Sequence, residues 1–95
     1  MAEDVASRRL RIHGRVQGVW FRGWMVDNAQ RLGIAGWVRN RRDGSVEAVV
    51  RGPLTQVDEL LRRCHIGPPA AEVHTVEVME EAGLVEAGFR QLPSA

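Results

Sequence analysis

One stretch near the N-terminus combines two glycines and an arginine at a spacing suited to binding an anion. It covers residues 14–22 and reads Gly-Arg-Val-Gln-Gly-Val-Trp-Phe-Arg. Gly14 and Gly18 allow the backbone to curl and to approach a ligand closely. A helical pattern begins near Phe21 without Ser, Thr, Asp or Asn as an N-cap, so its first N–H groups need another acceptor. A bound anion would satisfy those groups and would be stabilised by the helix dipole.

Arg22 adds a specific argument for phosphate. A cation in the first turn of a helix opposes the dipole, at a cost of roughly 0.3–1 kcal/mol when it is exposed. A bound phosphate reverses this effect, because the guanidinium group can grip two of its oxygens. The alternative interpretation is that the glycines only shape a tight turn and Arg22 faces solvent. The spacing alone leaves both interpretations open.

The distribution of charge also favours an anionic ligand for the first half of the chain. The net charge is only +1, but all thirteen basic residues are arginine. Residues 5–42 hold nine arginines and one acid, whereas residues 43–95 hold four arginines and nine acids. This asymmetry is typical of a chain whose first half meets an anion. A solvated surface is the alternative for most single arginines.

Length and composition predict one domain over residues 1–95, with residues 1–7 as a flexible tail. The chain has 95 residues, of which 44% are hydrophobic, enough for one modest core. Cys64 is the only cysteine, so no internal disulfide can form and a reducing compartment is expected. No signal peptide or membrane span is recognisable. We therefore expect a cytoplasmic monomer with no membrane partner.

Residue patterns predict the elements that position these residues. Residues 9–13 alternate as a half-buried strand, and residues 21–32 have helical spacing that stops at Gly33. Strands are predicted from 34 to 40 and from 46 to 50, joined by an Asp-Gly turn. A second helix follows Pro53, and a strand with an irregularity follows at 73–78. A short final strand is possible around Phe89.

This order, βαββαβ with a possible fifth strand, predicts the fold class. It is an α+β, ferredoxin-like sandwich, with two helices on one face of an antiparallel sheet of four to five strands. In this topology the first two strands are parallel and the third lies between them. Their carboxyl ends therefore meet at one edge of the sheet, about 10 Å apart. Asn40 ends the second strand opposite the glycine loop, so it is a candidate for positioning a water molecule beside a phosphoryl group.

Two motifs carry a resemblance to a known family. The stretch 14–22, followed by Gly-Trp-Val-Arg-Asn at 36–40, strongly resembles the two signature motifs of acylphosphatases. The segments 67–69 and 88–89 also look like family features, so the resemblance runs from about Arg9 to Phe89. It implies metal-independent hydrolysis of the carboxyl–phosphate bond of a small-molecule acyl phosphate, without a cofactor.

The resemblance also implies roles for residues. Arg22 would bind the phosphoryl group, and Asn40 would orient the attacking water through its side-chain amide. A phosphate oxygen of the substrate would accept the proton of that water. The loop N–H groups expected to join Arg22 are those of Arg15, Val16, Gln17, Gly18, Val19 and Trp20. Inorganic phosphate or sulfate could occupy the same place.

The sequence departs from the family pattern at two positions. Met25 stands where many relatives carry a hydroxyl residue, which puts any auxiliary water contact there in doubt. Gln91 stands at an inward position of the last strand that is usually apolar, so that strand could be short or absent. Neither departure touches Arg22 or Asn40.

Two other functions are alternatives for a chain of this fold. A non-catalytic module that binds acyl or carbamoyl phosphate would share the anion site, so only turnover separates it from an enzyme. An RNA-recognition module of this fold would stack bases on aromatics of its central strands. We expect no nucleic-acid partner, because the outward residues predicted on those strands include no aromatic. These residues are Arg9, Arg11, His13, Glu47, Val49 and Arg51.

Overall fold

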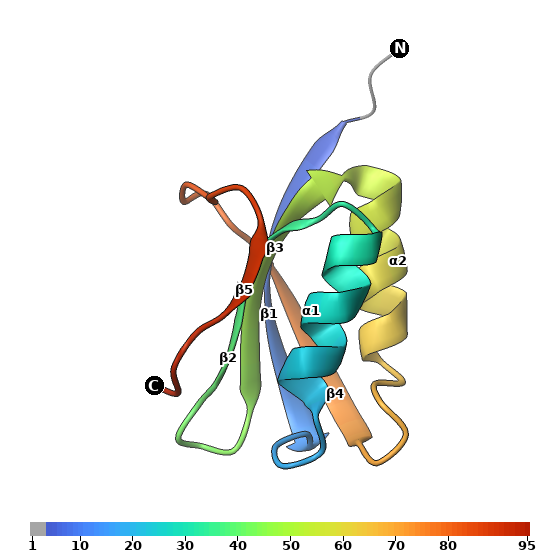
Figure 1. The fold of residues 1–95 in the computed structure, drawn as a ribbon, viewed down its shortest axis with the longest axis vertical. Helices are drawn as coiled ribbons and strands as arrows, with labels where there is room; N and C mark the ends of the chain where they lie inside the picture. Colours follow the sequence, from blue (N-terminus) through green and yellow to red (C-terminus); the bar gives the residue numbers. More distant parts are fainter. Residues whose placement is uncertain (1–3) are drawn as a thin grey trace.

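The computed structural model describes residues 4–95 as one five-stranded sheet with both helices on one of its faces (Figure 1). The predicted sandwich is therefore confirmed. The elements are β1 (Val5–Arg15), α1 (Phe21–Arg31), β2 (Ala35–Asn40), β3 (Val46–Pro53), α2 (Leu54–Cys64), β4 (Glu72–Glu80) and β5 (Phe89–Gln91). Neither helix within the described residues has the length and apolarity needed to cross a membrane.

The strand order explains how two distant segments meet at one edge. It is β4-β1-β3-β2-β5, so β3 lies between β1 and β2 as predicted. The prediction of an antiparallel sheet is wrong at one pair, because β5 runs parallel to β2. The chain reverses direction between β4 and β5, crosses the sheet and reaches β2, which runs the same way as β5. The fifth strand is formed, although it has only three residues.

The N-terminal part of β1 corrects the predicted tail. Val5, Ala6 and Ser7 pair with β3, and the side chain of Ala6 is buried. The expectation of a flexible tail over residues 1–7 is therefore wrong for residues 5–7, while residues 1–3 lie outside the described residues. Apolar and polar residues do not alternate clearly in this segment, so the local pattern did not predict a strand. The strand forms by pairing with the end of β3, which is distant in the sequence.

A bulge in β4 settles the role of Gly14. The register passes from the pair His13–Thr75 to the pair Gly14–Val73, so His74 is the extra residue. The irregularity predicted between Val73 and Val76 is confirmed. A side chain at Gly14 would collide with the carbonyl oxygen of Glu72. Gly14 therefore belongs to β1 and permits close approach of β4 rather than of a ligand.

The core between the sheet and the helices holds the start of α1 in place. Phe21, Met25 and Ala29 of α1 are buried against the sheet. Met25 has no exposed surface, so it serves packing and makes no contact with solvent. The thiol of Cys64 is also fully buried, and burial raises its pKa to about 12. Because Phe21 is fixed in this core, its neighbour Arg22 starts from a rigid position.

Candidate active site

A pocket of about 120 Å³ lies at the edge of the sheet where β1 and β2 end and α1 begins. Five of the predicted site residues line it, namely Val16, Gly18, Trp20, Arg22 and Asn40. Phe21, Gly23 and Gln91 line it as well and were not predicted as site residues. The structure therefore brings the glycine loop and Asn40 into one cavity, from segments that are far apart in the sequence.

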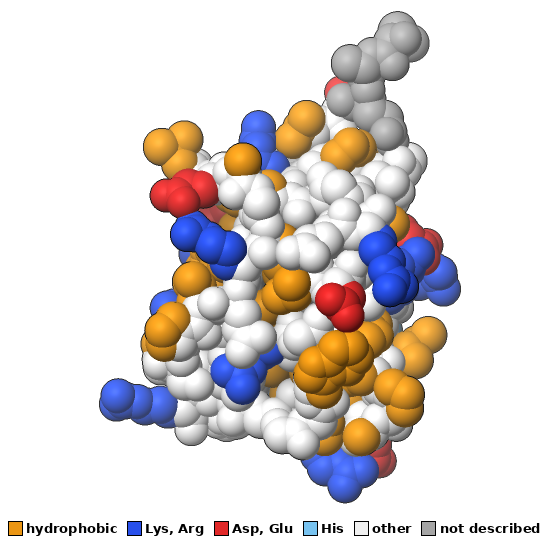
Figure 2. Space-filling model, in the orientation of Figure 1, with side chains coloured by type: hydrophobic (Ala, Val, Ile, Leu, Met, Phe, Trp, Pro, Cys, Tyr) orange, Lys and Arg blue, Asp and Glu red, His pale blue; other side chains and the backbone are white. Residues whose placement is uncertain are grey.

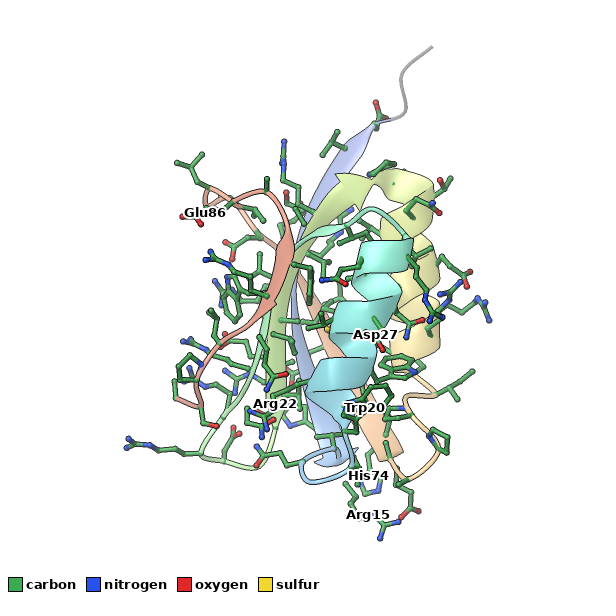
Figure 3. The ribbon with its side chains drawn as sticks, in the orientation of Figure 1. Arg15, Trp20, Arg22, Asp27, His74 and Glu86 are labelled. Carbon is green, nitrogen blue, oxygen red and sulfur yellow. The ribbon has the colours of Figure 1, made fainter. Side chains whose placement is uncertain are left out.

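Arg22 is a partly buried cation whose guanidinium group has no partner among residues 4–95. Most other arginines of the described chain are paired with carboxylates. Among the described residues 4–95, those that line the pocket include no acid. In Figure 3 the label of Arg22 lies on the side of α1 that faces β2 and β5. The pocket thus holds a positive charge that nothing described in the structure neutralises.

The loop before α1 supplies further donors. Within residues 4–95, the N–H groups of residues 16–20 donate to no acceptor. Gly18 and Trp20 both have left-handed backbone angles, with φ of 72° and 66°. Trp20 is the N-cap of α1 and forms no side-chain cap hydrogen bond, so the predicted uncapped start is confirmed. Successive N–H groups in such a curled segment form a concave anion site.

Asn40 presents an open acceptor at the other side of the pocket. Its amide oxygen Oδ1 is the one buried side-chain oxygen or nitrogen of residues 4–95 that lacks a hydrogen-bond partner. A buried polar atom of this kind normally binds a protein group or an ordered water. The residue ends β2, where its neighbour across the ladder is Val46. Its backbone oxygen accepts from the N–H of Ala95 at 3.0 Å, which holds the strand end.

Three predicted residues do not line the pocket with their side chains. Arg15 ends β1, is exposed and lies apart from Arg22 in Figure 3. Val19 packs against the core. Gln17 donates from Nε2 to the carbonyl oxygens of Arg41 and Ser45, at 2.7 and 2.9 Å. These two bonds tie the loop to the turn that follows Asn40.

Replacing Gln17 by alanine is expected to loosen both halves of the pocket together. The loss of two hydrogen bonds costs about 1–3 kcal/mol of stability at 0.5–1.5 kcal/mol each. Small displacements of positioning groups lower rates strongly, so we expect kcat/KM to fall roughly tenfold. Urea unfolding and steady-state kinetics measure the two effects. Gln30→Ala, on an exposed position of α1, is the matched control, and equal behaviour of the two variants would contradict the tie.

Glu47 stabilises the strand end from the opposite face of the sheet. This buried carboxylate accepts from Arg9 at 2.6 Å and from Arg39 at 2.9 Å, and Arg41 lies 3.4 Å away. Burial acts to raise the pKa of Glu47, but the hydrogen bonds and charges of Arg39 and Arg9 outweigh it and lower the pKa. Glu47 thus pairs with Arg39 and Arg41, which precede and follow Asn40 in the sequence, and it neutralises arginines outside the pocket.

The arginines bound to Glu47 also contact an aromatic ring on this face of the sheet. No aromatic was expected on the outward face of the central strands, but Trp37 lies next to them on β2. The guanidinium groups of Arg9 and Arg39 stand 5.7 and 4.9 Å from the centre of the Trp37 ring. These cation–π contacts cover the ring with side chains of the protein itself.

Trp20 lines the pocket at its exposed rim. It is 62% exposed, and its indole ring lies against Gly23, where an added Cβ would collide with it. In Figure 3 its label stands on the other side of the start of α1 from that of Arg22. Hydrophobic side chains gather over this end of the helix layer in Figure 2. Trp20 is therefore part of the rim and shields the first turn of the helix.

No group of three or more His, Cys, Asp and Glu side chains in residues 4–95 is arranged to hold a metal ion. The three histidines illustrate the point. His13 pairs with Glu77 at 3.1 Å, and His65 contacts the carbonyl oxygen of Leu61 at 2.9 Å. His74 is the exposed bulge residue of β4. The residues that line the pocket offer a guanidinium, backbone N–H groups and two carboxamides.

Comparisons with known proteins agree along nearly the whole chain. A family model described as Acylphosphatase matches residues 8–91. An acylphosphatase of Rhizorhabdus wittichii is 50% identical over 91 residues, which cover 96% of this chain and 92% of the relative. The solved acylphosphatase of Coxiella burnetii has 31% identity and a TM-score of 0.89, with 94% of each chain covered. That of Bacillus subtilis has 32% identity and a TM-score of 0.86, with 94% of this chain and 99% of the other covered.

Proposed function

The chain belongs to the acylphosphatase family, and from that premise we propose which of its groups perform the reaction. It is an acylphosphatase, which hydrolyses the carboxyl–phosphate bond of a small-molecule acyl phosphate. The proposal rests on the groups that line one pocket. The side chain of Arg22, the loop residues Val16, Gly18 and Trp20, and Asn40 all line one pocket of about 120 Å³, and within residues 4–95 neither Arg22 nor Oδ1 of Asn40 has a partner.

Arg22 and the loop bind the phosphoryl group. The guanidinium fork takes two phosphoryl oxygens, and the N–H groups of residues 15–20 take the remaining acceptors. This arrangement has a physical basis, because the described residues that line the pocket supply donors and a cation but no acid. Charge that develops on the equatorial oxygens during transfer is stabilised by donors already fixed in place.

Asn40 orients the attacking water. Its Oδ1 accepts one O–H of the water, and a phosphoryl oxygen accepts the other and takes the proton. The water oxygen bonds to phosphorus as the bond from phosphorus to the acyl oxygen breaks, and the electron pair leaves with the carboxylate. The products are a carboxylate and dihydrogen phosphate. A carboxylate is a good leaving group, so positioning and charge stabilisation supply most of the catalysis.

A titration with inorganic phosphate tests the binding half of this proposal. We expect the backbone amide resonances of residues 15–23 to shift in ¹⁵N spectra, with one saturating curve, because these N–H groups gain a charged acceptor. Resonances on β4 and on the end of α2 serve as internal controls. Shifts centred on the exposed arginines Arg42 and Arg51 instead would contradict the proposed cradle.

The alternative of a non-catalytic phosphate-binding module is distinguished by turnover. The purified protein is expected to hydrolyse benzoyl phosphate, since nothing observed favours the module. We also propose a cytoplasmic monomer. The absence of a disulfide among the described residues, where Cys64 is a free cysteine, supports the reducing compartment.

A further inference from the structure

Gln91 is a polar residue on the face of β5 that is covered by the helices, where an apolar residue is usual. Phe89 and Gln91 alternate onto the same face of β5, and Phe89 is buried under α1. The neighbour of Gln91 across the ladder is Val38, which is fully buried. Arg90 points to the other face and pairs with Glu86 at 2.6 Å. The carboxamide of Gln91 thus lies on the helix-covered face of the sheet, at the end of the core.

The parallel pairing of β5 with β2 brings Gln91 beside Asn40. Val38 is opposite Gln91, and Asn40 follows Val38 by two residues on the same face. Asn40 and Gln91 are separated by one spacing between strands and by the rise of two residues along a strand. Their Cα atoms therefore lie about 8 Å apart. Both residues line the pocket that contains Arg22. Two carboxamides therefore reach into the same end of the cavity from adjacent strands.

The side chain of Gln91 is also uncommitted. It forms no hydrogen bond with any other residue in the described range 4–95, and it is exposed at the pocket rim. A solvated rim residue is the simplest alternative. A water held for reaction, however, requires two to four polar partners. Asn40 and a phosphoryl oxygen supply two, and Gln91, which lies on the adjacent strand and lines the same pocket, can supply a third.

We propose that Gln91 is a second positioning residue for the attacking water, which it holds together with Asn40. The inference rests on the role proposed for Asn40. The in-line direction of attack puts the water on the β2–β5 side of the phosphorus and the leaving carboxylate on the far side. Gln91 therefore contacts the water and makes no contact with the acyl group.

A double-mutant cycle with benzoyl phosphate tests the inference. In the otherwise unchanged enzyme, Gln91→Leu is expected to lower kcat about tenfold, as for the loss of one hydrogen bond in the transition state. KM and the inhibition constant of inorganic phosphate are expected to stay within about twofold. In the Asn40→Ala background, the same substitution is expected to lower kcat by less than about twofold, because the two residues hold one water.

Controls separate this role from a structural one. Arg90→Gln, on the opposite face of β5, is expected to leave kcat unchanged, and Gln91→Asn is expected to recover part of the rate. Equal losses from Gln91→Leu in both backgrounds would overturn the inference, as would a rise in KM that depends on the acyl group. An unchanged kcat in Gln91→Leu would also overturn it. If Asn40→Ala itself left kcat unchanged, the proposed role of Asn40 would fail instead.

Discussion

Replacing Arg22 by alanine is expected to reduce kcat/KM for benzoyl phosphate by at least about 10³-fold. Removal of one preorganised donor from a site that stabilises developing charge typically costs 10²–10³ in rate. Arg22 supplies two donors and the positive charge of the pocket, and no other arginine lines that pocket. The inhibition constant of inorganic phosphate is expected to rise in parallel. Steady-state kinetics with phosphate as competing ligand measure both effects.

The stability of the same variant provides an independent check. Arg22 opposes the dipole of α1 and has no partner within residues 4–95, so its removal is expected to leave the unfolding free energy unchanged or to raise it by roughly 0.3–1 kcal/mol. Arg22→Lys keeps the charge but loses the fork, and an intermediate rate is expected. Arg31→Ala, in the last turn of the same helix, is the control. A variant Arg22→Ala that keeps a tenth of the activity would refute the assignment.

The start of α1 shows how far sequence patterns reach. The missing cap and the misplaced Arg22 predicted an anion site, and the pocket lies there. The missing cap alone is a weaker signal, because α2 also lacks a side-chain cap. The N–H of Leu54 instead donates to the carbonyl oxygen of Asp4 at 2.8 Å. What distinguishes the two helix starts is tertiary structure, which leaves the loop before α1 without acceptors.

The two glycines of the loop illustrate the same limit. From the sequence, Gly14 and Gly18 are equally good candidates for a loop that binds a ligand, but only Gly18 lines the pocket. Gly14 is needed for the approach of β4, whose bulge at His74 brings Glu72 against it. That approach joins segments nearly sixty residues apart, so no local pattern contains it. Asn40, by contrast, could be placed from topology, because parallel strands end at a common edge.

Gln91 could be noticed but not interpreted from the sequence. A polar residue at an inward position of the last strand suggested a short or absent β5. The strand is present, and its parallel pairing with β2 depends on a loop that crosses the whole sheet. Only that pairing puts Gln91 beside Asn40 and gives the polar side chain a place at the pocket. The strand is short, as the residue type suggested, and its last residue lines the pocket.

Replacing Asn40 by alanine is expected to separate turnover from binding. The change removes the acceptor that holds the water but leaves Arg22 and the loop N–H groups in place. We expect kcat to fall by about 10²–10³-fold, because an oriented nucleophile is replaced by a mobile one. The inhibition constant of inorganic phosphate is expected to stay within about threefold, as for an interaction made mainly in the transition state.

Asn40→Asp sharpens the test, because it keeps the size of the side chain and adds a negative charge. A carboxylate facing a bound phosphoryl group repels it, so both kcat and phosphate affinity are expected to fall in this variant. The pair of variants therefore distinguishes water positioning from phosphate binding at one residue. If Asn40→Ala weakened phosphate as much as Arg22→Ala does, Asn40 would belong to the phosphate cradle. The attacking water would then need another partner, and the pocket offers Gln91.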